Sequence, residues 1–214
     1  MKTIAVLISG QGSNMASLAR ACVQEGWPAR IVRVLSNRPE APGLALAREL
    51  GLETEAFSHR DHPSREAFDA ALHERLLACG ADLVVLAGFM RVLTPSFVQA
   101  WSGRLLNIHP SLLPAFPGLD THARALAAGV RLHGATVHAV TPTLDQGPIL
   151  AQAVVPVLEG DDPARLAARV LRAEHRLLPT AVRWCIEGRV RFAEGRVEVA
   201  GVGDTERLLW CPEA

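Results

Sequence analysis

The chain has 214 residues, of which 49% are hydrophobic and 21% charged, so it can bury a sizeable core and general disorder is not expected. Its 22 basic and 22 acidic residues leave a formal net charge of zero. This balance argues against nucleic acid as the main partner, because counterion release needs a basic excess. No segment approaches the roughly 20 apolar residues that span a membrane, and the first apolar run is too short for a signal peptide. We therefore expect a soluble, cytoplasmic protein.

The four cysteines are far apart in the chain and form no CxxC pair. They are Cys22, Cys79, Cys185 and Cys211. This pattern predicts neither a zinc site nor a disulfide framework. Reduced thiols agree with a cytoplasmic location.

Apolar runs alternate with helical patterns over the first half of the chain. Strands are predicted at 3–9, 30–36, 82–88 and 104–109, with a possible short strand at 54–57, and helices at 14–24, 45–51 and 64–80. In the third helix Ser64 is a plausible N-cap, and Gly80 a plausible C′ residue. The spacing predicts right-handed βαβ units. They would form a Rossmann-like, doubly wound α/β fold, with a mostly parallel twisted sheet and helices on both faces.

Beyond Pro110 the pattern changes. Strands at 134–140 and 148–157 are expected to pair antiparallel, and 189–201 reads as a β-hairpin with Glu194-Gly195 at its turn. A long helix is predicted at 162–188, with Asp162 as cap, Pro163 at the first position, and Pro179 kinking or breaking it. We expect one domain over 1–188, with a C-terminal hairpin and tail (189–214) packed on it.

The segment SGQGSN (9–14) joins the first predicted strand to the first predicted helix. Two glycines permit a tight turn and close approach of backbone N–H groups to a ligand, and a helix start adds partial positive charge, which together favour phosphate. The segment has neither the dinucleotide spacing GxGxxG nor the Lys-Ser/Thr ending of a triphosphate-binding loop. A glycine turn with Ser13 or Asn14 as N-cap explains the same residues, so both interpretations stay open.

Asn107 and His109 end the predicted strand 104–109, and their period-2 spacing predicts that both side chains leave on one face. The carboxyl ends of parallel strands are where open α/β sheets hold their sites. An amide donor beside an imidazole donor can hold an oxyanion. The structural alternative is a histidine that only hydrogen-bonds the proline-rich loop after it.

Asp145 follows the predicted strand 134–140, where an aspartate is also an ordinary turn residue. If its carboxylate faces His109, it favours the imidazolium form of that ring. Asn107, His109 and Asp145 would then form a proton-handling set that needs no metal.

Three further polar residues receive structural interpretations. His133 and His138 flank a predicted strand and lack the spacing of a helical metal pair. Glu174 lies on the long predicted helix and, from the pattern alone, is expected to be a surface charge. None of the three is assigned to a site on pattern alone.

Four segments together resemble the phosphoribosylglycinamide formyltransferase family, within the folate-dependent formyltransferases. They are ISGQGSN near the start, VVLAGFMRVL at 84–93, RLLNIHPSLLPAFPG at 104–118 and LDQGPILAQ at 144–152. The resemblance runs in order and without large gaps from about residue 2 to 188. It implies an enzyme that moves a formyl group from 10-formyltetrahydrofolate, a co-substrate, to the amine of glycinamide ribonucleotide. It also implies no metal, and a monomer or homodimer.

The resemblance also implies roles for the matched positions. Asn107 and His109 would hold the oxyanion, and Asp145 would support His109 in proton transfer. The positions implied to bind the ribonucleotide are Gly12, Ser13, Asn14, Leu171, Arg172, Ala173 and Glu174, with Glu174 accepting from the ribose hydroxyls. Those implied to bind the folate are Arg65, Met90, Arg91, Val92, Leu93, Thr141, Pro142, Thr143 and Leu144.

The chain departs from the family pattern in three places. Gln146 stands where a glycine is common, Leu171 replaces a polar residue of some relatives, and the segment after Gly188 carries no family signature, so no catalytic role is expected there.

Three other functions are alternatives to glycinamide ribonucleotide formylation. A formyltetrahydrofolate deformylase would normally carry an added N-terminal domain, and a methionyl-tRNA formyltransferase a basic C-terminal one. A non-catalytic phosphate-binding module would not explain Asn107, His109 and Asp145 together.

Overall fold

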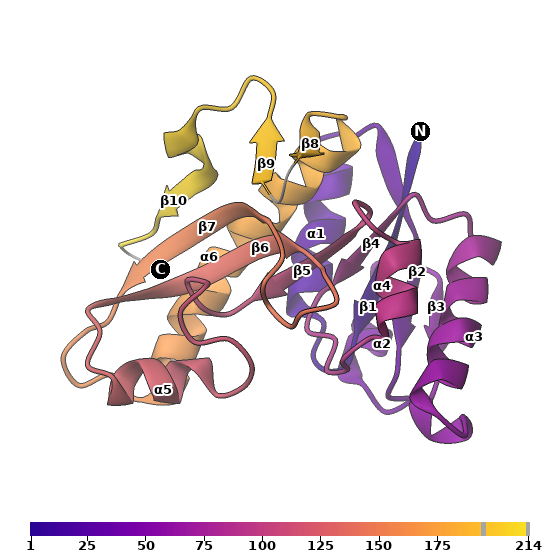
Figure 1. The fold of residues 1–214 in the computed structure, drawn as a ribbon, viewed down its shortest axis with the longest axis horizontal. Helices are drawn as coiled ribbons and strands as arrows, with labels where there is room; N and C mark the ends of the chain where they lie inside the picture. The colour runs from indigo at the N-terminus through magenta and orange to yellow at the C-terminus, as the bar shows by residue number, and fades with distance from the viewer. Residues whose placement is uncertain (194–195, 213–214) are drawn as a thin grey trace. The chain divides into compact units, whose positions relative to one another are not determined.

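The computed structural model describes residues 1–193 and 196–212 (Figure 1). It divides into two compact units, one made of 1–107 with 140–142 and the other of 108–139 with the chain from 143 onward. The predicted division into 1–188 and 189–214 stays a prediction.

The strands confirm the predicted fold class. They are β1 (Lys2–Ile8), β2 (Ala29–Ser36), β3 (Thr54–Ala56), β4 (Leu83–Leu86), β5 (Leu105–His109), β6 (Leu132–Ala139), β7 (Ile149–Pro156), β8 (Val190–Ala193), β9 (Arg196–Val199) and β10 (Leu208–Trp210). Eight of them are assigned to one sheet in the order β10-β7-β6-β5-β4-β1-β2-β3, and β8 and β9 form a separate pair. The pairs β1–β2, β1–β4, β2–β3, β4–β5 and β7–β10 are parallel, and β6 pairs antiparallel with β7.

The helices are α1 (Ser13–Gln24), α2 (Pro42–Glu49), α3 (Arg65–Ala78), α4 (Pro95–Ala100), α5 (Thr121–Ala127) and α6 (Pro163–Ile186). Two short 3₁₀ helices, η1 (His59–Asp61) and η2 (Asp204–Arg207), complete the described elements. The sequence pattern did not predict α4, α5 or β10. None of the described helices is both long and apolar enough to cross a membrane.

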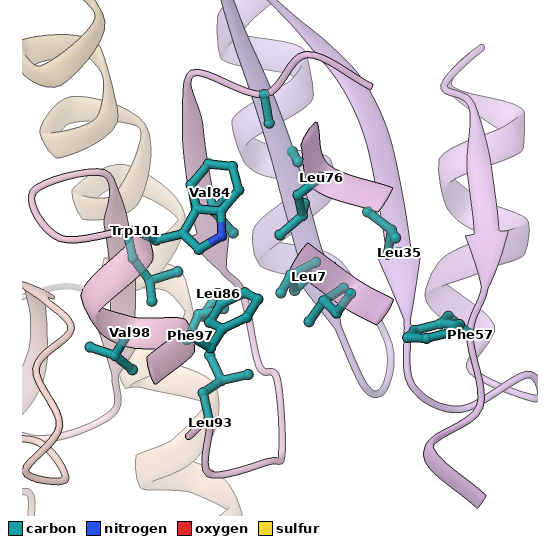
Figure 2. Close-up of a cluster of buried hydrophobic side chains, with 14 of the residues drawn as sticks. Leu7, Leu35, Phe57, Leu76, Val84, Leu86, Leu93, Phe97, Val98 and Trp101 are labelled. Atoms are coloured by element: carbon teal, nitrogen blue, oxygen red, sulfur yellow. The ribbon is translucent and has the colours of Figure 1, made fainter. Parts of the chain in front are cut away.

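In the first unit, helices cover both faces of the parallel strands. Alternate residues of β1, including Leu7, join a buried cluster with Leu76 of α3 and Phe97 of α4, shown in Figure 2. Because side chains alternate across a strand, Ile8 points to the opposite face, where its Cδ1 atom lies beside Gly43 of α2. Burial of both faces explains why β1 is apolar at every position from Ile4 on.

Two helix starts test the capping predictions. Ser64 is the N-cap of α3, since its Oγ accepts from Ala67 N at 3.1 Å, and Gly80 follows the helix with φ 67°, as predicted. The prediction of Ser13 or Asn14 as the cap of α1 is wrong. Gly12 takes that position with φ 73°, and the helix begins at Ser13 without a side-chain cap bond.

In the second unit, β6 and β7 form the predicted antiparallel pair, and α6 packs against both. Asp162 caps α6 as predicted, because its Oδ1 accepts from Arg165 N at 2.8 Å, with Pro163 at the first position. The prediction of a break at Pro179 is wrong, since α6 is one continuous helix of 24 residues. Neighbours buried on both sides of Pro179, such as Leu178 and Ala181, hold the helix against the sheet, and this packing outweighs the missing N–H.

The chain after residue 188 has more regular structure than expected. The predicted hairpin is present as β8 paired antiparallel with β9, while its turn at Glu194-Gly195 lies outside the described residues. The short helix η2 then leads into β10, which pairs parallel with β7, with Leu208 beside Gln152. The tail therefore extends the sheet of the second unit.

Candidate active site

The predicted site residues of the first unit gather at the carboxyl ends of its parallel strands. Ser9, just after β1, donates its backbone N–H to Gly88 O at 3.0 Å. Its buried hydroxyl lies 2.5 Å from Asn37 Oδ1 and accepts from Met90 N at 2.8 Å. Asn107 pairs with Leu86, the last residue of β4. The 9–14 loop, the 88–93 segment and Asn107 thus share one edge of this unit's sheet, where α/β folds hold ligands.

The glycines of the 9–14 loop have a structural purpose of their own. A Cβ on Gly12 would lie 2.8 Å from the Cα of Gly43, and Gly43 donates its N–H to Gly10 O at 2.9 Å. The starts of α1 and α2 therefore touch through their backbones, which only glycine permits. The glycine pattern alone does not require a phosphate, so the structural interpretation accounts for Gly12 and Gly43 fully.

The positions implied to bind the folate offer both apolar and cationic groups. Met90 and Val92 are 60% and 50% exposed, whereas Leu93 is buried. The guanidinium of Arg91 lies over the Phe68 ring, 4.4 Å from its centroid, which holds that side chain in place. Arg65 is the exposed first residue of α3. The segment thus presents exposed apolar side chains beside one arginine held in place and one exposed arginine.

In the second unit, His109 and Asp145 lie together. The Nδ1 atom of His109 is 3.5 Å from Oδ2 of Asp145, and both side chains are nearly buried, at 7% and 6% exposed. The other ring nitrogen, Nε2, lies 3.0 Å from the carbonyl oxygen of Phe116, and Asp145 Oδ2 also accepts from Gly118 N at 2.8 Å. Both ring nitrogens of His109 thus face oxygen acceptors.

Backbone strain marks the same loops. Asp145 and Phe116 have φ values of 53° and 54°, in the left-handed region that non-glycine residues seldom adopt. Such conformations cost on the order of 1–3 kcal/mol and persist where the surrounding contacts determine them. Asp120 also has a positive φ, 55°, but the other two bear directly on the imidazole: Asp145 is held by Gly118 N, and Phe116 carries the carbonyl that faces His109.

His138, which the sequence pattern did not single out as a site residue, faces the same carboxylate. Its Nε2 lies 3.9 Å from Asp145 Oδ1, and its Nδ1 lies 2.9 Å from Ala139 O. Burial lowers the pKa of His138, outweighing the opposite effects of the Ala139 carbonyl and of Asp145. A neutral ring that donates from Nδ1 turns its Nε2 lone pair toward Asp145. In the sequence, Thr136 and His138 are two residues apart, which predicts that both side chains lie on one face of the strand. This spacing gave no reason to pair His138 with Asp145.

Two more histidines lie close to His109 and are held neutral. Burial lowers the pKa of His133 to about 4, and the nearby His122 and His109 add to the effect. Burial and His109 likewise lower the pKa of His122. The two rings meet edge to face, with centroids 5.3 Å apart. The surroundings of His109 therefore contain neutral imidazoles that do not compete with it for a proton.

The remaining predicted residues are divided between the two units. The first unit holds Gly12, Ser13, Asn14, Arg65, Met90, Arg91, Val92, Leu93, Asn107, Thr141 and Pro142, and the second holds His109, Thr143, Leu144, Asp145, Leu171, Arg172, Ala173 and Glu174. The prediction that Glu174 is a surface charge is wrong, because it is only 6% exposed on the inner side of α6. Its neighbour Arg172 is exposed. Within the described ranges 1–193 and 196–212, no group of three or more His, Cys, Asp or Glu side chains could hold a metal ion.

Residues 2–182 match the family described as formyl transferase. The phosphoribosylglycinamide formyltransferase of Escherichia coli is 44% identical over 198 residues, which cover 92% of this chain and 93% of that protein.

Solved structures give the same picture. The glycinamide ribonucleotide transformylase 1 of Symbiobacterium toebii superposes with a TM-score of 0.91 at 48% identity, covering 93% of this chain and 94% of that one. The formyltetrahydrofolate deformylase of Burkholderia mallei superposes with a TM-score of 0.83 at 33% identity, covering 92% of this chain but 69% of that one.

Proposed function

Because the chain belongs to the formyl transferase family, we propose that it transfers a formyl group from 10-formyltetrahydrofolate to the amine of 5-phosphoribosylglycinamide, a step of purine synthesis. The observation that carries this proposal is the buried pairing of His109 with Asp145. A relative named for this activity matches over almost the whole length of both proteins. This coverage matters because a match to only part of such a relative would not support a proposal of the complete reaction.

The proposed reaction passes through a tetrahedral oxyanion. The substrate amine attacks the formyl carbon, a C–N bond forms, and the formyl oxygen takes the negative charge. When the intermediate collapses, the bond to N10 of the folate breaks, the attacking nitrogen loses a proton and N10 gains one. The products are formylated ribonucleotide and tetrahydrofolate. An amine nucleophile needs no covalent enzyme intermediate, so this reaction does not call for a serine or cysteine nucleophile.

Asn107 and His109 are proposed to hold the oxyanion, and Asp145 to orient the imidazole and support it in proton transfer. The Nε2 atom of His109 lies 3.0 Å from Phe116 O, so the 116–118 segment has to release this nitrogen before it can donate to a substrate. The Nδ1 atom can keep its contact with Asp145 throughout. Losing one oxyanion donor typically costs about 3 kcal/mol, which is two to three orders of magnitude in rate.

The binding roles follow the residues implied by the family. The Gly12–Asn14 loop is proposed to hold the ribonucleotide phosphate, supported by the N-terminus of α1, and Glu174 to accept from the ribose hydroxyls. The exposed side chains of Met90 and Val92 support a folate site at that segment. The other residues proposed for the two sites are Leu171, Arg172 and Ala173 for the ribonucleotide and Arg65, Arg91, Leu93, Thr141, Pro142, Thr143 and Leu144 for the folate.

Three properties of the whole protein belong to the same proposal. We propose that it acts in the cytoplasm, as a monomer or homodimer, and that the reaction uses no metal. Small-molecule substrates alone are proposed as its partners.

The deformylase is the second candidate, because its structure superposes over most of this chain. The two functions differ in the acceptor, which is the ribonucleotide amine in one and water in the other. Release of tetrahydrofolate is followed by absorbance, with and without glycinamide ribonucleotide. The proposal expects turnover only with the ribonucleotide. Equal turnover without it would establish a deformylase, and no turnover under either condition would leave a ligand-binding module.

A further inference from the structure

The C-terminal tail sends one arginine into the sheet of the second unit. Arg207, at the end of η2, donates from Nε to Leu150 O and from Nη2 to Ile149 O, both at 2.8 Å, and from Nη1 to Val197 O at 3.1 Å. One guanidinium thus binds three backbone carbonyls, two of them in β7 and one in β9. Hydrogen bonds from a charged donor contribute more to stability than hydrogen bonds between neutral groups.

The two carbonyls in β7 are consecutive, which a regular strand does not allow. Successive carbonyls of a strand point in opposite directions, so a single group reaches two in a row only where the strand is irregular. The register shows the irregularity, because Val137 pairs with Ala151 while His138 pairs with Ile149, which leaves Leu150 as an extra residue. Bulges of this kind redirect nearby side chains and occur often beside active sites. Arg207 therefore binds the outer side of a β-bulge.

The bulge lies at the end of the loop that carries Asp145. Upstream of it, Pro148 O accepts from Ala139 N at 2.9 Å, and a Cβ on Gly147 would lie only 1.7 Å from Ala139 O. The chain is thus fixed without a break from Gly147 to Leu150. Asp145 is two residues before this fixed stretch, with its carboxylate 3.5 Å from the ring of His109.

We propose that Arg207 is a positioning residue, which fixes the bulge at Ile149–Leu150 and through it the place of Asp145 beside His109. The inference rests on the proposed function, in which Asp145 supports His109. It assigns a purpose to the segment after Gly188, in which no catalytic role was expected. Arg207 touches neither the imidazole nor the carboxylate, so its effect on turnover should depend entirely on Asp145.

The test compares Arg207→Met with a matched control. Methionine keeps the apolar stem and removes all donors. Arg189→Met is the control, because Arg189 also binds tail carbonyls, Ala200 O at 2.8 Å and Gly201 O at 2.9 Å, neither of which is in β7. We expect Arg207→Met to lose between about 5-fold and 100-fold in kcat, since a misplacement of about 1 Å can cost 10²-fold. KM for both substrates should change less than about threefold and Arg189→Met should keep normal kcat.

A double-mutant cycle separates positioning from general destabilisation. In an Asp145→Asn background, Arg207→Met should cost no more than about twofold further, because the group it positions is already lost. If the losses in kcat of Arg207→Met and Asp145→Asn multiply in the double variant, the inference is overturned. Equal kcat for Arg207→Met and Arg189→Met would also overturn it. If Arg207→Met does not fold, Arg207→Lys, which has a single donor group, carries the same cycle.

A measurement without turnover distinguishes failure of this inference from failure of the proposed function. Hydrogen exchange at the backbone amide of Ala139, which donates to Pro148 O, should be at least about 10-fold faster in Arg207→Met than in Arg189→Met. Unchanged exchange would overturn the inference even in an active enzyme. An inactive wild type with the expected exchange would refute the formyl transfer but keep the role of Arg207 in fixing the bulge.

Discussion

Replacing Gly147 by alanine tests how tightly the Asp145 loop is fixed. The added Cβ would lie 1.7 Å from Ala139 O, and this separation must open to at least 3.0 Å, a shift of 1.3 Å. A backbone carbonyl in a strand cannot move aside as a flexible side chain would, so the loop itself has to move. A displacement of this size two residues from Asp145 should lower kcat by about 100-fold. Overpacking should also cost about 1–3 kcal/mol.

Gly134→Ala is the matched control for this prediction. Its Cβ would lie 1.8 Å from Ala153 O, a clash of almost the same size, but inside the β6–β7 pair opposite Val154 and away from the bulge. Both variants should melt about 2–12 °C lower, from 1–3 kcal/mol at 2–4 °C each. Only Gly147→Ala should lose kcat at a temperature where both are folded. Equal kcat in the two variants, or an unchanged melting temperature in Gly147→Ala, would refute the described loop geometry.

Three further predictions concern single groups of the second unit. His109→Ala and Asp145→Asn should each lose at least about 100-fold in kcat while still binding folate in a fluorescence titration; near-normal rates in either would contradict the mechanism. The pKa of His133 is lowered to about 4, so the unfolded state binds a proton at this residue first, and the free energy of unfolding falls as the pH drops from about 6.5 toward 4. In His133→Phe, the melting temperature should therefore fall less over that pH range than in the wild type. An identical fall in both proteins would contradict the role of His133. Asp161→Asn should lower the free energy of unfolding, measured in urea, by about 3 kcal/mol, because it leaves the buried Arg169 without its charge partner. In the wild type the Arg169 guanidinium donates to the two Asp161 carboxylate oxygens at 2.6 Å and 3.0 Å. A change below about 1 kcal/mol would contradict this prediction.

Local rules predicted most of the fold, and they failed where a tertiary contact decided the outcome. Ser64 and Asp162 cap their helices as expected, because capping depends on the neighbouring residues alone. Pro179 does not break α6, because packing on β6 and β7 is worth more than the bond that proline removes. Gly12 replaces Ser13 as the cap of α1, because its backbone has to meet Gly43, a contact between segments far apart in the sequence.

The candidate site shows the same division. Period 2 and the position at a strand end were sufficient to single out His109, and its partner Asp145 was proposed from a turn. The burial of Glu174 and the approach of His138 to Asp145 depend on how α6, β6 and the loops pack, which no local pattern encodes. Arg207 was missed for the same reason, since its partners Ile149 and Leu150 precede it by more than 50 positions.

The pairing of β10 with β7 has a consequence during synthesis. β7 emerges from the ribosome before β10, and its sequence ILAQAVVP contains no charged residue. Until Leu208–Trp210 are made, the edge of β7 that they occupy is an open row of backbone donors and acceptors. Such uncharged edges readily pair with other chains. Prematurely terminated or proteolytically shortened chains should therefore be prone to aggregate, and the tail is what closes this edge in the finished molecule.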